Sequence, residues 1–361
     1  MAAPLKGMKT TVLKVDNTNY DQVIATASQA LREGKIVGFP TETVYGIGAD
    51  VNNPQTLAKL IRLKNRPKEK PFTIHVADKD DFHKFTPGAN IFARRLMDRY
   101  WPGPLTMIVK SLESDTTMIG MRLPGLKLAR DIIRQSAITV ALPSANPASL
   151  PPATTAKEVL EYYNDRIDVV VDNGKATIGD PSTVVMLKSD TFQILRTGII
   201  TDEDIINTAC KKILFVCTGN TCRSPMAEAF MKHLLAERLR TSTDRLPSHG
   251  YLVKSAGVAA VEGEPPTMNA SKALTKWDIY IDSYRATVVN RSLLENSDHI
   301  YVMTSSLKAV LSEMLGGDDE KIELLDRDSE DLIDPFGSNE ACYTRCASRI
   351  YSNLLEILET I

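Results

Sequence analysis

One short segment combines a cysteine and an arginine at a spacing that suits phosphate chemistry. It reads Cys217-Thr-Gly-Asn-Thr-Cys-Arg-Ser-Pro225, directly after the apolar run 213–216 and before a stretch with helical periodicity. A loop between a strand and a helix can direct backbone N–H groups and the positive end of the helix at one anion. The segment therefore predicts a phosphate-binding loop.

Most residues of this loop can be given a role in phosphoryl transfer. Cys217, with a pKa lowered by the surrounding amides, is expected to attack phosphorus as a thiolate, while Arg223 holds two phosphate oxygens. Gly219 and Asn220 tolerate left-handed backbone conformations, and Ser224 can donate to the thiolate. The other loop residues expected around the phosphate are Thr218, Thr221 and Cys222.

Two further side chains belong to this hypothesis. Asp334, in the turn Asp334-Pro-Phe-Gly337 after the last expected strand, offers a general acid for the leaving group, although a structural turn-capping role is the alternative. Cys222 has two interpretations: it forms a disulfide with Cys217 on oxidation, or it packs beneath the loop.

Together with Ser255-Ala-Gly257, these motifs resemble the low-molecular-weight protein tyrosine phosphatase family over residues 211–361. The resemblance implies a phosphocysteine on Cys217, no metal or other cofactor, and phosphorylated proteins as substrates. Thr221 and Phe336-Gly337 depart from the usual pattern and resemble the protein arginine phosphatase branch. Because a hydroxyl suits a guanidino-phosphate better than a phenyl ring, we expect phosphoarginine to be preferred over phosphotyrosine.

The N-terminal part of the chain carries short polar motifs rather than one dense segment. The motif Thr41-Glu-Thr43 lies in a glycine-flexed turn after the expected strand 36–39, and four cations occur within residues 64–70. His75 lies inside another expected strand. These residue types predict a site for an anion, and the run of cations favours a polyphosphate.

In combination these motifs resemble the YrdC-like threonylcarbamoyl-AMP synthase family over residues 20–200. The resemblance rests on Phe39-Pro-Thr-Glu-Thr-Val-Tyr-Gly46, Lys64-x-Arg-Pro67, Pro143-Ser-Ala-Asn146, Ser182-Thr-Val-Val185 and Leu195-Arg196. It implies that L-threonine, bicarbonate and ATP, with Mg²⁺, give threonylcarbamoyl-AMP and diphosphate. The product would serve the threonylcarbamoyladenosine modification of tRNA, with at most a weak contact to tRNA itself.

The resemblance also implies residue roles. Threonine would contact Thr43, His75, Arg122 and Ser182, and ATP would contact Lys64, Arg66, Lys70, Ser144, Asn146 and Arg196. A hydroxyl that the family places near ATP is missing at Pro152. The alternative is that this part is a nucleotide- or RNA-binding regulatory module without synthase activity, and that only the phosphatase is catalytic.

The elements that must position these residues indicate an α/β protein with two domains, 1–207 and 208–361. In the first, we expect strands 36–39, 73–76, 105–109, 138–142, 168–171, 183–187 and 192–196 with helices near 21–33, 54–63 and 155–163, forming a twisted mixed sheet. Residues 201–204 are interpreted as the linker region. In the second, strands near 213–216, 251–254, 299–303 and 322–325 alternate with helices, which predicts a doubly wound parallel sheet.

Composition limits the function classes. The 361 residues are 43% hydrophobic and 24% charged with a net charge of −2, which excludes a disordered chain and a nucleic-acid coat. The five cysteines all follow residue 209 and lack zinc-site spacing. We find no membrane span or signal peptide and expect a cytoplasmic protein.

Overall fold

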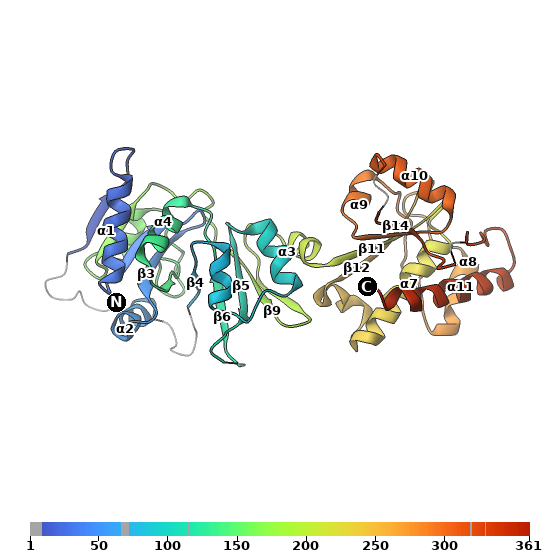
Figure 1. The fold of residues 1–361 in the computed structure, drawn as a ribbon, viewed down its shortest axis with the longest axis horizontal. Helices are drawn as coiled ribbons and strands as arrows, with labels where there is room; N and C mark the ends of the chain where they lie inside the picture. The colour runs from blue at the N-terminus through green and yellow to red at the C-terminus, as the bar shows by residue number, and fades with distance from the viewer. Residues whose placement is uncertain (1–8, 66–71, 115, 318–319, 329) are drawn as a thin grey trace. The chain divides into compact units, whose positions relative to one another are not determined.

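The computed structural model describes residues 9–65, 72–114, 116–317, 320–328 and 330–361. Its contacts divide the chain into two units, Met1–Ala209 and Cys210–Ile361 (Figure 1). No helix of the described residues is long and apolar enough to span a bilayer.

The first unit is built on a mixed sheet of ten strands in the order β1-β8-β2-β3-β7-β4-β6-β5-β9-β10. The strands are β1 (Thr11–Lys14), β2 (Val37–Pro40), β3 (Tyr45–Asp50), β4 (Ile74–His75), β5 (Leu105–Lys110), β6 (Met118–Arg122), β7 (Val140–Ala141), β8 (Val169–Asp172), β9 (Thr183–Leu187) and β10 (Phe192–Arg196). The sheet combines parallel pairs, such as β5 with β9, and antiparallel pairs, such as β2 with β3. The predicted twisted mixed sheet is confirmed.

Helices cover this sheet and pack on it through apolar cores. The helices are α1 (Tyr20–Arg32), α2 (Pro54–Lys64), α3 (Ile91–Tyr100), α4 (Lys127–Ser136), α5 (Ala156–Tyr163) and α6 (Asp202–Ala209), with a 3₁₀ segment η1 (Lys79–Lys84). One core joins α1 and α4 to the sheet through residues such as Leu31 and Ile132, and another joins α2 and α5 through Leu60 and Val159. Burial of these apolar faces fixes the sheet that carries the polar motifs.

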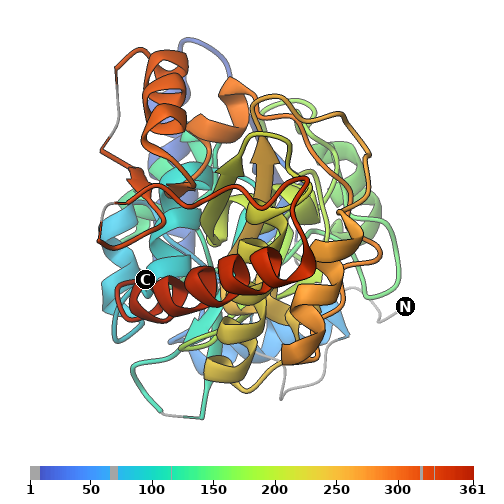
Figure 2. The ribbon, with the colours of Figure 1, turned by 90° about the vertical axis from the view of Figure 1, so that its right-hand side faces the viewer.

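The second unit has four parallel strands in the order β12-β11-β13-β14. They are β11 (Lys211–Cys217), β12 (Tyr251–Gly257), β13 (His299–Val302) and β14 (Ile322–Leu324), and the helices are α7 (Arg223–Leu239), α8 (Met268–Leu274), α9 (Arg291–Glu295), α10 (Ser305–Leu315) and α11 (Glu340–Leu358), with 3₁₀ segments η2 (Thr243–His249) and η3 (Thr275–Trp277). Figure 2 shows α11, in red, crossing in front of the strands on the same face as α7 and α8. The predicted doubly wound parallel sheet is confirmed.

Two local predictions were wrong. Residues 201–204 do not link the units: they begin α6, whose Ile205 and Ala209 are buried, and Tyr100 Oη of α3 lies 3.1 Å from Thr208 Oγ1. The turn expected after β2 is also shorter than predicted, because the chain reverses over residues 41–44 and then forms β3, which pairs antiparallel with β2.

Candidate active sites

The loop between β11 and α7 surrounds the sulfur of Cys217. Cys217 ends β11 and is buried, and Arg223 begins α7. The Asn220 N–H donates to Cys217 Sγ over 3.2 Å, and Ser224 Oγ lies 2.9 Å from the same sulfur. Asn220 adopts a left-handed φ of 53°, as the sequence predicts for this loop position.

A buried network holds Asn220 in this conformation. Its Oδ1 accepts from Tyr284 Oη (2.6 Å) and from the Thr287 N–H (2.7 Å). Its Nδ2 donates to Ser224 Oγ (2.8 Å) and to Ser255 Oγ (3.1 Å). Both polar atoms of the side-chain amide therefore have hydrogen-bond partners, and these bonds fix the conformation of the loop at Asn220.

Gly257 allows the loop to lie directly against β12. A Cβ atom at this position would come within 2.5 Å of the Thr218 carbonyl oxygen and 2.9 Å of the Asn220 nitrogen. Any larger residue would push the loop away from the strand. The Ser255-Ala-Gly257 motif thus supports the loop in two ways: the Ser255 hydroxyl accepts a hydrogen bond from Asn220, and Gly257 leaves room for the loop backbone.

Arg223 and Asp334 meet although 111 residues separate them in the chain. The Arg223 guanidinium is buried, forms an ion pair with the half-exposed Asp334 carboxylate, and donates through Nη1 to the Leu332 carbonyl over 2.9 Å. Its Nε is buried without a hydrogen-bond partner among the described residues. A buried guanidinium with an unused donor next to a thiol is suited to binding an anion such as phosphate.

The expected low pKa of Cys217 is not found. Burial raises the pKa of this thiol, and hydrogen bonds from Ser224 and Asn220 together with the charge of Arg223 oppose the rise only in part. The hydrogen-bond donors of the loop, which lower the pKa of the thiol, could be predicted from the sequence. The loss of water around the buried sulfur, which raises the pKa, could not.

Cys222 and Thr221 lie on the far side of the loop. Both Cys217 and Cys222 are free thiols, and Cys222 Sγ lies 3.3 Å from Tyr343 Oη and 3.4 Å from Thr267 Oγ1. Thr221 is buried and its carbonyl accepts from the Thr267 N–H over 3.0 Å. In this state Cys222 packs beneath the loop, and the oxidised alternative stays a prediction.

The first unit contains a cavity of about 580 Å³ that gathers residues from distant motifs. The predicted site residues that line it are Lys64, His75, Arg122, Ser144, Asn146, Ser182 and Arg196. Thr43 is buried, and its Oγ1 accepts from Arg122 Nη2 over 2.8 Å. The predicted Arg66 and Lys70 lie outside the described residues.

Lys64 joins two of the motifs at one edge of the cavity. It is the last residue of α2, and Asn65 after it adopts a left-handed φ of 48° that ends the helix. The Lys64 ammonium donates to the Ser144 carbonyl (2.6 Å) and to the main-chain and side-chain oxygens of Asn146. Ser144 Oγ also donates to Asn146 Oδ1 over 2.6 Å, so the three residues form one unit.

The cavity is positively charged around a neutral histidine. Arg196 donates through Nε and Nη2 to the Ser182 carbonyl over 3.1 and 2.8 Å, and burial together with the charge of Arg122 lowers the pKa of Arg196. Burial and the same Arg122 charge lower the pKa of His75 to about 3, so that its ring carries no proton charge near neutral pH. The buried guanidinium of Arg122 and the more exposed one of Arg196, which both line the cavity, favour an anionic ligand in this space.

Comparison with known proteins assigns both units. Residues 29–198 match the Sua5/YciO/YrdC family model, described as "Telomere recombination". A Bacillus subtilis threonylcarbamoyl-AMP synthase is 38% identical over 210 residues, 55% of this chain and 61% of that protein. A Methanocaldococcus jannaschii protein that bears this name provisionally is 30% identical over 54% of this chain and 96% of its own length. The chain belongs to the Sua5/YciO/YrdC family.

The second unit matches a different family from the first, Sua5/YrdC unit. Residues 212–361 match the model "Low molecular weight phosphotyrosine protein phosphatase", so the chain is a fusion, as the sequence predicts. A Pyrococcus abyssi Sua5 variant shares the fold with a TM-score of 0.52 at 20% identity, covering 87% of this chain and 97% of its own. A Bacillus subtilis YwlE mutant is 30% identical over 42% of this chain and 97% of its own, with a TM-score of 0.37.

The match covers 61% of the length of the Bacillus synthase, so the activity, substrates and partners of the whole protein are proposals.

Two residues without a role predicted from the sequence contact the predicted ligand-binding side chains: Thr106, which lines the Sua5/YrdC cavity, and Glu42, which is not among its lining residues. Thr106 Oγ1 lies 2.8 Å from Ser182 Oγ, and no motif marks Thr106 in the sequence. Glu42 stands inside a quoted motif without an assigned role, and its carboxylate accepts from Arg122 Nη2 over 2.6 Å. Both residues hold a predicted ligand-binding side chain in place.

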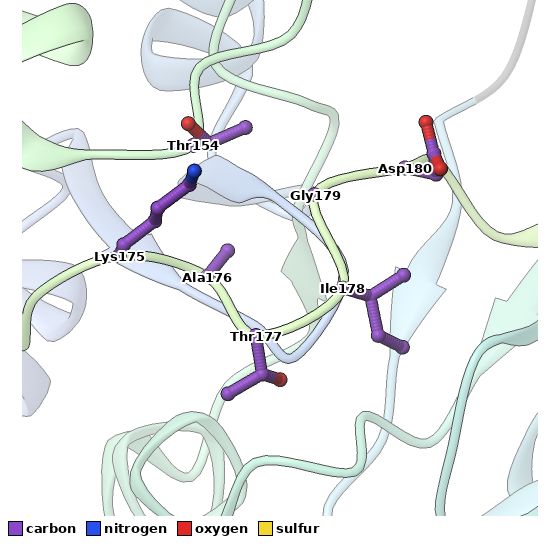
Figure 3. Close-up of a pocket in the computed structure, with 7 residues that line it drawn as sticks. All are labelled: Thr154, Lys175, Ala176, Thr177, Ile178, Gly179 and Asp180. Atoms are coloured by element: carbon purple, nitrogen blue, oxygen red, sulfur yellow. The ribbon is translucent and has the colours of Figure 1, made fainter.

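A separate depression is bounded by Thr154 and the loop 175–180 (Figure 3). Figure 3 shows the Lys175 side chain extending toward Thr154. The Ile178 and Gly179 N–H groups donate to the carbonyls of Glu42 and Thr43 over 2.8 and 2.9 Å. This loop therefore supports the turn after β2 from outside, and none of the predicted site residues lines the depression.

Proposed function

We propose that the protein is a bifunctional enzyme: a threonylcarbamoyl-AMP synthase joined to a cysteine-dependent protein phosphatase. For the synthase, the observation that carries the proposal is the convergence of Lys64, Arg122, Ser182 and Arg196 on one cavity. For the phosphatase, it is the convergence of Cys217, Arg223 and Asp334 around one loop. The proposed synthase uses ATP and the proposed phosphatase uses phosphoproteins, and both substrates fit a protein of the cytoplasm.

In the synthase, the amine of L-threonine attacks the carbon of bicarbonate, and water leaves to give a carbamate. A carbamate oxygen then attacks the α-phosphorus of ATP, and diphosphate leaves. Arg122 would pair with the threonine carboxylate, while Arg196 and Lys64 would neutralise charge on the phosphates. The chain contributes mainly orientation and charge neutralisation.

The predicted Mg²⁺ fits this site as an ion carried by ATP. No group of three or more His, Cys, Asp or Glu side chains in the described part of the chain is arranged to hold a metal. Cations and hydroxyls line the cavity instead. The ion would therefore be held by the ATP phosphates, where it reduces their charge. The product would feed tRNA modification, with at most a weak contact of this chain to tRNA.

The synthase proposal is tested by diphosphate release that depends on both threonine and bicarbonate. Arg196→Ala should abolish it, while Arg94→Ala, a matched change on the exposed side of α3, should not. Full activity of the Arg196 variant would reject the assigned site. Salt-sensitive tRNA binding without any diphosphate release would instead favour the regulatory module.

In the phosphatase, the Cys217 thiol gives its proton to a phosphate oxygen of the bound substrate, and the thiolate then attacks phosphorus. As the S–P bond forms, the bond to the leaving group breaks, and the protonated Asp334 carboxyl gives its proton to that group. Water then attacks the phosphocysteine, Asp334 accepts one of its protons, the S–P bond breaks, and phosphate leaves. Arg223 would hold the phosphoryl oxygens throughout. Asp334 forms an ion pair with Arg223 in the free protein. A bound phosphate must therefore replace the Asp334 carboxylate as the partner of the guanidinium.

We further propose phosphoarginine as the preferred substrate. Support comes from the buried Thr221 in the loop and from the exposed Phe336, which is followed directly by Gly337 rather than by a second aromatic residue. Turnover of phosphoarginine and phosphotyrosine peptides by the wild type and by Thr221→Ile tests this. A preference for phosphotyrosine that Thr221→Ile leaves unchanged would reject it. Cys217→Ser should abolish phosphatase activity and leave the synthase intact, and Arg196→Ala should do the reverse.

A further inference from the structure

Two exposed segments frame the phosphate loop, and we propose that they select the sequence around the phosphorylated residue. The mouth segments, residues 258–268 and 330–340, carry exposed apolar and acidic side chains. We infer that their partner is a basic stretch of a protein with an apolar side chain beside the phosphorylated residue. This inference rests on the proposed phosphatase function and extends it to a class of substrate.

Backbone contacts place the mouth segments beside the loop. The Ala259 N–H donates to the Thr218 carbonyl over 2.9 Å, and the Thr267 N–H donates to the Thr221 carbonyl over 3.0 Å. The second segment reaches the loop through the pair of Asp334 with Arg223. A peptide that delivers a phosphate to Arg223 would therefore lie close to both segments.

Both segments expose large apolar side chains. Val261, Met268, Ile333 and Phe336 have relative exposures of 66–85%. None of them contributes to the core of the second unit. Four such side chains around one opening favour contact with apolar groups of a partner, since contiguous exposed apolar surface is typical of binding sites.

The charged side chains of the mouth segments all have the same sign. The carboxylates are Glu262, Glu264, Glu330, Asp331, Asp334 and Glu340, and neither segment contains Lys or Arg. The ion pairs that these carboxylates form are Arg223 with Asp334, Arg349 with Glu330 at 3.6 Å and Lys272 with Glu340 at 4.0 Å.

Three of these carboxylates are not balanced by a cation. Glu262, Glu264 and Asp331 form no ion pair within the described ranges. Glu262 instead accepts from the Val288 N–H over 2.9 Å, and Asp331 accepts from the Ser305 N–H over 2.6 Å. Arg285, on the segment whose Ala286 pairs with this loop, directs its guanidinium at the carbonyls of Asp282 and Tyr284. The entrance therefore stays negative around the buried cation.

In this charge distribution, the phosphate of a substrate meets a positive charge, whereas the residues that flank the phosphorylated residue meet negative charges. Arg223 is buried with an unused Nε donor, so it can bind one phosphate at short range. Further anionic groups on the substrate would lie beside Glu262 and Glu264, where repulsion acts within a Debye length of about 8 Å at physiological salt. Basic flanking residues would be attracted over the same range.

The test uses three phosphopeptides with the same central phosphorylated residue. The peptides differ only in the residues that flank the phosphorylated one. These are Arg and Leu in the Arg–Leu peptide, Asp and Leu in the Asp–Leu peptide, and Arg and Ser in the Arg–Ser peptide. We expect kcat/KM for the Arg–Leu peptide to exceed that for the Asp–Leu peptide by about tenfold at low salt, and the ratio to shrink at high salt. Glu264→Lys should remove most of this ratio, whereas Glu313→Lys on the exposed side of α10 should not. Hydrolysis of p-nitrophenyl phosphate should be unchanged in both variants.

Met268→Ser tests the apolar part of the surface. It should lower kcat/KM for the Arg–Leu peptide by about threefold without affecting the Arg–Ser peptide, since the lost contact is worth less than 1 kcal/mol. Val310→Ser, on α10, is its matched control. Equal rates for acidic and basic peptides at low salt would overturn the inference.

Binding to Cys217→Ser separates this inference from the proposed function. If the wild type hydrolyses neither phosphate esters nor phosphoarginine, the proposed function fails, and the affinities of Cys217→Ser for the same three peptides still test the surface. Tighter binding of the Arg–Leu peptide supports the inference, and equal binding overturns it.

Discussion

Glu42 and Arg122 form a buried ion pair beside the Sua5/YrdC cavity, with Glu42 Oε1 2.6 Å from Arg122 Nη2. The other carboxylate oxygen of Glu42 accepts from the Gly125 and Leu126 N–H groups over 2.7 and 3.2 Å. Glu42 thus fixes the guanidinium relative to the start of α4. Arg122 Nη2 also donates to Thr43, so one short turn sets the direction of this cation.

Replacing Glu42 with Ala should weaken threonine binding and destabilise the first unit. It leaves a buried guanidinium unpaired, which typically costs about 3–5 kcal/mol. We expect the KM for threonine to rise at least about tenfold with a smaller change in kcat, because a positioning residue acts through Arg122. Glu42→Gln keeps an acceptor for Arg122 and should restore most of the stability. An unchanged threonine KM in a folded Glu42→Ala variant would contradict this role.

Replacing Asp334 with Asn should slow the phosphatase by about 10²–10⁴ for substrates with poor leaving groups, the usual contribution of a general acid. The loss should be smaller for p-nitrophenyl phosphate, whose leaving group needs little protonation. Because the same carboxylate assists the attack of water, phosphocysteine should accumulate and be detectable by mass spectrometry of the quenched enzyme. Equal losses for good and poor leaving groups would argue that Asp334 only holds Arg223.

Replacing Gly257 with Ala should displace the phosphate loop. The new Cβ would lie 2.5 Å from the Thr218 carbonyl oxygen, and relief of such overpacking typically costs about 1–3 kcal/mol. Denaturant unfolding should show this loss together with reduced phosphatase activity, while diphosphate release by the other unit is unchanged. Gly219→Ala is the control for stability, since its Cβ would meet Thr221 Oγ1 at an ordinary 3.7 Å. A Gly257→Ala variant as stable as this control would refute the close approach.

His75 should make the first unit less stable in acid. Its pKa is about 3 in the folded protein and near 6.5 when exposed, so the unfolded chain binds an extra proton between these values. The His75 contribution to stability is complete above pH 6.5 and falls by up to about 1.4 kcal/mol per pH unit as the pH drops toward 3. Hydrogen exchange of β4 and β6 at pH 7.5 and 5 should show it. His75→Gln should reduce the dependence, and His83→Gln, an exposed control, should not.

The fold and the contiguous motifs could be predicted from the sequence because their signals are local. The segment from Cys217 to Ser224 lies between one strand and one helix, so its loop geometry follows from neighbours in the chain. The pairing of Asp334 with Arg223 was predicted as a shared site but not as an ion pair in the free protein.

Other features could not be predicted because packing decided them. Tyr45 and Gly46 were expected to belong to the glycine-flexed turn after residue 39, yet Tyr45–Asp50 forms a central strand. A Cβ at Gly46 would come within 2.6 Å of Leu142, so the glycine serves close packing rather than chain reversal. Likewise, the acidic start of α6 resembled a linker until Ile205 and Ala209 were seen to be buried.

The sequence by itself determined the two-domain α/β organisation, through the periodicity of its strands and helices, and its motifs determined the resemblance to two families, which implies the fold types and the candidate site residues. The tertiary structure alone decided the electrostatic state of those residues. Burial raises the pKa of Cys217, lowers that of His75 and pairs Arg122 with Glu42. Each of these effects depends on which groups replace water around a side chain, and those groups come from distant parts of the chain.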